Sequence, residues 1–116
     1  MSVVEAVRAA VTGHVDSAGR IEIVDFAATS ADKTALNAVT VRFVVVGGSQ
    51  PGTYRATVGT LDNPAGTFDV AWYAGLIKTH IDEVVSTSLL PGEPGQSVTW
   101  EPWTITRAEP SGTRGV

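Results

Sequence analysis

Valines recur every three or four positions over the first part of the chain, as they do on one face of a helix. Ser2 and Glu5 fit a capping box, in which the serine hydroxyl accepts a hydrogen bond from an amide of the first turn. Gly13 supplies a residue that adopts the left-handed conformation after a helix end. The pattern predicts a helix over about 3–12.

Alternating apolar and polar positions predict three strands in the next part of the chain, over 21–26, 39–46 and 53–60. Between the first two, residues 27–38 are small and polar and favour turns or a short helical excursion. The loop 47–52 contains three glycines and a proline, so we expect the second and third strands to form an antiparallel hairpin across it.

After a break at 61–66, the pattern is ambiguous. Phe68, Val70 and Trp72 alternate as in a strand, whereas apolar residues from position 70 onward also recur at helical spacing. The length of the uninterrupted segment favours a helix over about 69–87, and whether it begins as a strand stays open.

The C-terminal part predicts one more strand, over 98–107, after a Gly- and Pro-rich break at 90–95. Pro102 cannot donate to a strand ladder, so this strand lies at a sheet edge or is bulged there. The order α-β-β-β-α-β predicts an α+β fold in which a mostly antiparallel sheet of about four strands packs with two helices. We expect one domain over 1–108 and a flexible polar tail over 109–116.

Composition narrows the function classes. The 116 residues are 43% hydrophobic and 17% charged, with a net charge of −4 and no cysteine. This is too apolar for a disordered chain, and it excludes disulfide scaffolds and thiol nucleophiles. No basic cluster indicates a nucleic-acid partner, and apolar runs such as 43–46 are too short to cross a membrane. We therefore expect synthesis in the cytoplasm, with no nucleic-acid or membrane partner.

Candidate chemistry is sparse, and we expect no catalytic residues, no metal and no cofactor. His80 lies near Asp82 and Glu83, so one of these acids could orient the imidazole as a general base, or the group could be a solvated helix face. His14 with Asp16 suits a helix end, where a histidine complements the helix dipole. Ser49 lies in a glycine-rich loop that matches neither a nucleophile elbow nor a phosphate loop.

The aromatic residues indicate protein contacts. Trp100 and Trp103 lie beside prolines on the expected edge strand, and indoles are frequent at interface centres. Their alternative role is to close the core against the helix at 69–87. Together with Gln50 in the loop 47–52 and Asn63 in the loop 61–66, they are the interface candidates.

In order of elements and in composition, the chain resembles small virion proteins of tailed bacteriophages, of the head-decoration, head–tail joining or tail-terminator type. The resemblance implies a non-enzymatic protein that self-associates or joins neighbouring structural proteins and is assembled into a virion. It also implies contact roles for the loops 47–52 and 61–66, the strand 98–107 and the tail 109–116.

Two other functions compete with this one. One is a small-ligand pocket protein or small enzyme that uses His80 with Asp82 or Glu83, and Tyr73 as a proton donor. The other is a regulatory or immunity-type module that binds one protein through an acidic surface, with a strong dependence on salt.

Overall fold

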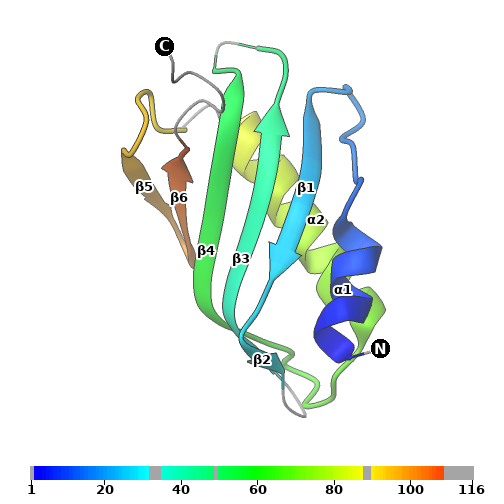
Figure 1. Cartoon of the computed structure of the whole chain (residues 1–116). Helices are drawn as coiled ribbons and strands as arrows, with labels where there is room; N and C mark the ends of the chain where they lie inside the picture. Colours follow the sequence, from blue (N-terminus) through cyan, green and yellow to red (C-terminus); the bar gives the residue numbers. More distant parts are fainter. Residues whose placement is uncertain (1, 32–34, 49, 88–89, 109–116) are drawn as a thin grey trace.

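Two helices pack on one face of an antiparallel sheet (Figure 1). The computed structural model describes residues 2–31, 35–48, 50–87 and 90–108. Within them the order of elements is α1 (Val3–Val11), β1 (Ile21–Ala27), β2 (Ser30–Ala31), β3 (Ala35–Val45), β4 (Gly52–Asp62), α2 (Val70–Ser86), β5 (Ser97–Trp100) and β6 (Trp103–Arg107).

The predicted α+β class is confirmed, and both predicted helices form. At α1 the Ser2 side chain accepts from the Glu5 N–H at 3.1 Å, as the capping box requires. At α2 the Asp69 carboxylate accepts from the N–H groups of Ala71 and Trp72, so the ambiguous segment is helical from residue 70. No helix among the described residues is long and apolar enough to span a membrane.

The sheet is built on the long hairpin of β3 and β4, which confirms the predicted pairing across the loop 47–52. The strand order is β1-β3-β4-β6-β5, and the short β2 pairs with β3. Ala38, with φ of 51°, and Gly59 fall at the one position left out of the β3–β4 register, which is the same on both sides of it. The alternation of buried and exposed positions changes there, since Leu36 and Val39 are both buried. The expectation of turns or a helical excursion over 27–38 is wrong in its described part, because β2 and the start of β3 lie there; residues 32–34 are outside the description.

The single strand predicted over 98–107 is also wrong. Residues on either side of Glu101 and Pro102 form two short strands, β5 and β6, that pair with each other from Trp100↔Trp103 to Ser97↔Thr106. Proline has no N–H for a ladder, so it lies in the turn rather than inside a longer strand. A sheet of about four strands was expected. Among the described residues it has five strands and, in addition, the two-residue β2. The tail 109–116 lies outside the described residues.

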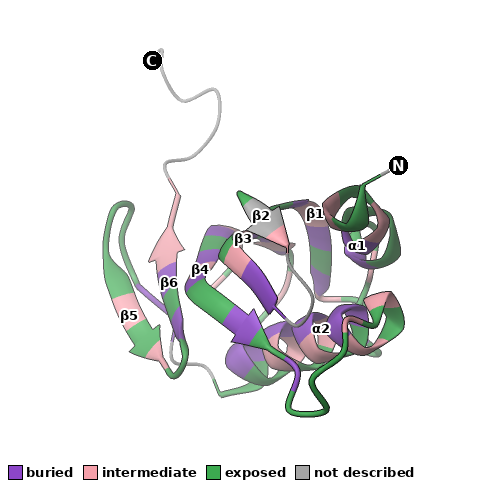
Figure 2. Cartoon of the chain, turned by 90° about the horizontal axis from the view of Figure 1, so that it is seen from below, coloured by how far each residue is buried: buried purple, intermediate pink, exposed green. Residues whose placement is uncertain are grey.

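The core lies between the helices and one face of the sheet. Its largest fully buried side chains include Trp103, Tyr54, Tyr73, Phe26, Phe43 and Leu36. The buried positions of α2 lie three or four residues apart, for example Tyr73, Ile77 and Ile81, which is the stripe expected of a helix lying on a sheet. Burial falls off toward β5, which lies at the edge of the sheet away from α1 (Figure 2).

Candidate interaction surface

A partly covered apolar surface lies between α2 and β5. Val98 and Trp100 of β5 face the helix side of the sheet but are only half-buried, because β5 is the outermost strand. On α2, Trp72 and Leu76 are also half-buried, and with His80 they recur at every fourth position. We call these five residues the α2–β5 groove.

The two sides of the groove meet at His80. Its ring lies 6.5 Å from the Trp100 ring, centroid to centroid. Beside it, the α2 residues between Ala71 and Glu83 line an open cavity of about 410 Å³, with Trp72, Leu76 and His80 among its walls. The five residues of the groove are mostly apolar and aromatic, which is the composition found at the centres of protein interfaces.

Trp103 lies behind the groove and not on it. Its side chain is 0% exposed, and its Nε1–H donates to His80 Nδ1 at 2.9 Å. Because Nδ1 accepts, neutral His80 carries its proton on Nε2. Of the two roles open to the tryptophans, closing the core against α2 is the one that Trp103 has. Trp100 remains an interface candidate.

Gln50 and Asn63, the two interface candidates in loops, make hydrogen bonds within the chain. The Gln50 amide donates to the Leu90 carbonyl at 2.8 Å and accepts from the Leu90 N–H, which ties residues 50 and 90 together. Asn63 is 7% exposed, and its side chain accepts from the Ala65 N–H at 2.9 Å, as in an Asx turn. Both side chains are engaged within the chain. Ser49 lies outside the described residues.

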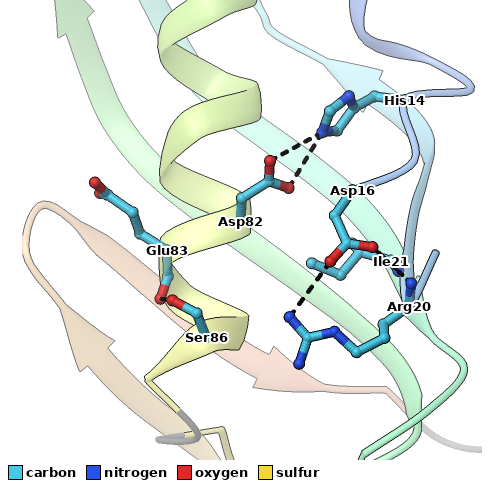
Figure 3. A network of polar contacts seen from close by, with 7 residues as sticks. All are labelled: His14, Asp16, Arg20, Ile21, Asp82, Glu83 and Ser86. Carbon is cyan, nitrogen blue, oxygen red and sulfur yellow. Dashed lines mark hydrogen bonds and ion pairs between the residues drawn. The ribbon is translucent and has the colours of Figure 1, made fainter. Parts of the chain in front are cut away.

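The acid–base pair considered for His80 does not form. Asp82 lies instead beside His14, with His14 Nε2 3.1 and 3.2 Å from the two carboxylate oxygens (Figure 3). The Glu83 carboxylate points away from this pair, and Ser86 donates to the Glu83 backbone carbonyl at 2.9 Å. Tyr73, the candidate proton donor, is fully buried and stacks on Phe68. The described residues contain no cluster of three or more potential metal ligands among His, Cys, Asp and Glu.

Asp16 pairs not with His14 but with the start of β1. Its carboxylate accepts from the N–H groups of Arg20 and Ile21, at 2.6 and 3.1 Å, and from the Arg20 guanidinium at 3.3 Å. Burial raises the pKa of Asp16, but these hydrogen bonds together outweigh it and leave the pKa below its ordinary value. This carboxylate shapes the turn before β1.

A second feature, which the sequence analysis did not identify, lies on the face of the sheet that no described helix covers. Thr40, Thr57, Thr104 and Thr99 lie opposite one another in a row that crosses β3, β4, β6 and β5. In the next row, Arg42 of β3 lies directly opposite Arg55 of β4. The signal in the sequence was the threonines at alternate strand positions, which become a row only when the register is known.

The two outer edges of the sheet differ. The residues before β1 bond to the outer edge of its first half. Gly13 donates to the Ile23 carbonyl at 2.8 Å, and Ile23 donates to the His14 carbonyl at 3.0 Å. In the part of the chain that the structure describes, nothing pairs with the outer edge of β5. An open strand edge next to a half-buried tryptophan is therefore a candidate contact surface.

Comparison of the chain with protein-family models, with curated proteins and with solved structures finds no match in any of the three.

Proposed function

We propose that this protein is a non-enzymatic assembly protein that acts through protein–protein contacts at the α2–β5 groove. One observation carries the proposal: Trp100 is only half-buried on an edge strand that no described strand covers. An indole has a large apolar area and few rotatable bonds, so its burial by a partner contributes more than that of most side chains.

The proposed setting is the virion of a tailed bacteriophage, as a head-decoration, head–tail joining or tail-terminator component made in the cytoplasm. Support comes from the resemblance in composition and in order of elements described above. The partners are further copies of the chain or neighbouring structural proteins.

The polar groups favour this function over an enzyme built on His80. A general base needs a free lone pair directed at substrate, and His80 Nδ1 already accepts from Trp103. The acid nearest in sequence that could orient His80, Asp82, lies beside His14.

Light scattering over a dilution series tests the proposal, because a monomer has a mass of 12.1 kDa. We expect a larger mass that falls on dilution between about 1 mM and 1 µM, the range that a contact of about 4 to 8 kcal/mol covers. Trp100→Ala lowers the mass at a given concentration. Val46→Ala is the matched control, since Val46 is an apolar side chain 65% exposed just after the end of β3. A strict monomer throughout contradicts self-association through the groove, and equal effects of both variants contradict the contact role of Trp100.

A further inference from the structure

We propose that β5 pairs with β5 of a second copy, antiparallel and across a twofold axis, with Thr99 opposite the partner's Thr99. The inference rests on the proposed function and names the surface and the partner that it uses.

The difference between the two sheet edges indicates the symmetry. Head-to-tail strand addition would need a free edge at both sides of the sheet. At β1, the residues before the strand already bond to its first half. Arg8 of α1 also contacts Asp25 of β1, with Nε 2.9 Å from the carboxylate. The residues before β1 bond to part of its edge, whereas no described residue pairs with the outer edge of β5. This difference favours pairing of like with like over head-to-tail addition, which gives a twofold arrangement.

The peptide groups of β5 are oriented for this pairing. The Arg107 N–H donates to the Gln96 carbonyl at 3.0 Å, so this carbonyl faces β6, whereas the Gln96 N–H donates to the Glu93 carbonyl. Given the pairing of β5 with β6, alternation along an antiparallel ladder then turns the peptide groups of Ser97 and Thr99 toward the open edge. The strand contains no proline, no charge and no bulge, which are the usual devices that keep an edge strand from pairing.

The register follows from which side chains share a face. Directly opposite residues of two paired strands lie on the same face, so Val98 and Trp100 can meet only Val98, Trp100 or Gln96 of the partner. With Thr99 opposite the partner's Thr99, each Val98 lies against the partner's Trp100, and four half-buried apolar side chains cover one another. With Val98 opposite the partner's Val98, each Trp100 would lie against the polar Gln96 of the partner, so the first register is favoured.

The opposite face of the sheet agrees with this register. The row of Thr40, Thr57, Thr104 and Thr99 would continue into the same row of the partner without a change of side-chain type. Threonines directly opposite each other are favourable cross-strand neighbours. The dimer would then carry one continuous sheet with two α2 helices on its inner face.

A single cysteine tests the pairing, because the chain has none of its own. In the proposed register the two Thr99 Cα atoms lie about 5.5 Å apart, within the range of a disulfide. Thr99→Cys, treated with oxidised glutathione, should therefore run mostly as a covalent dimer on a non-reducing gel. Thr104→Cys is the matched control: it lies on the same face one strand further in, so its two copies are separated by three strand spacings of roughly 14 Å in total, too far for a disulfide.

A second variant tests the same edge without a cross-link. Thr99→Pro removes an N–H that faces the open edge and leaves the β5–β6 ladder its donors. We expect unchanged circular dichroism and a mass that falls to that of the monomer. If the wild-type protein is oligomeric but Thr99→Cys cross-links no better than Thr104→Cys, the β5 pairing is wrong and the assembly function stands on another contact. If the wild-type protein is a monomer and neither variant cross-links, both the β5 pairing and self-association through the groove are overturned.

Discussion

Replacing Trp103 by phenylalanine separates the core role of this tryptophan from a contact role. The indole is fully buried and its N–H donates to His80 at 2.9 Å. Phenylalanine removes the donor and two ring carbons from the core. Two buried carbons at about 0.8 kcal/mol each and one hydrogen bond of about 1 kcal/mol give a loss of about 2.5 kcal/mol in the free energy of unfolding.

Urea unfolding followed by far-ultraviolet circular dichroism measures this loss. The midpoint should fall with the slope unchanged, and thermal unfolding should occur about 10 °C lower, since each kcal/mol corresponds to about 4 °C in a chain of this size. Wild type and variant are compared at one protein concentration, because self-association would itself add stability.

Trp100→Phe is the control, since Trp100 differs mainly in being half-exposed. We expect it to cost less than about 1 kcal/mol, in the range of substitutions away from the packed core. A double-mutant cycle of Trp103→Phe with His80→Ala should show a coupling of about 1 kcal/mol, the part due to the hydrogen bond. Equal losses for Trp103→Phe and Trp100→Phe would refute the assignment of Trp103 to the core.

Three further predictions concern single substitutions measured by chemical unfolding. Asp16 has a lowered pKa, so its contribution to stability is fully present above about pH 3.8 and is lost as the pH falls through its folded value; Asp16→Asn should flatten the acid limb of a plot of stability against pH. Leu36→Ala should cost about 2–5 kcal/mol because the side chain is fully buried, whereas Val46→Ala should stay within about 0.5 kcal/mol. Tyr54→Phe removes a hydroxyl that donates to the Gln50 carbonyl at 2.7 Å and accepts from Arg107 at 3.1 Å, so a loss of about 1–2 kcal/mol is expected; no loss would mean that water replaces both bonds.

The elements that could be predicted are those whose signals are local. Ser2 and Glu5 lie within one helical turn, and the cap that they predict forms. The hairpin of β3 and β4 could be predicted because both strands alternate and a glycine-rich loop joins them directly. In both cases the interacting residues are close in sequence, so the local sequence pattern is enough to predict their contact.

Contacts between distant segments could not be predicted in this way. His14 lies beside Asp82, 68 positions away, because the connection after α1 runs past α2 on its way to β1 (Figure 3). The sequence placed each of these side chains next to a nearer partner, Asp16 for His14 and His80 for Asp82. The fold overrides both pairings, since Asp16 accepts from the backbone before β1 and His80 accepts from Trp103.

Trp100 and Trp103 show why burial was the hardest property to predict. The two residues face each other across the β5–β6 ladder, and both side chains lie on the helix side of the sheet. They differ only in which strand carries them: β6 lies next to β4 and under α2, whereas β5 lies one strand further out. A displacement of one strand, about 4.8 Å, thus makes one indole a core residue and leaves the other half-exposed. The turn at Pro102 creates this arrangement, because it puts the two indoles on one face but on different strands, whereas residues three apart in an unbroken strand point to opposite faces. The residue that ends the strand therefore also determines which tryptophan is buried.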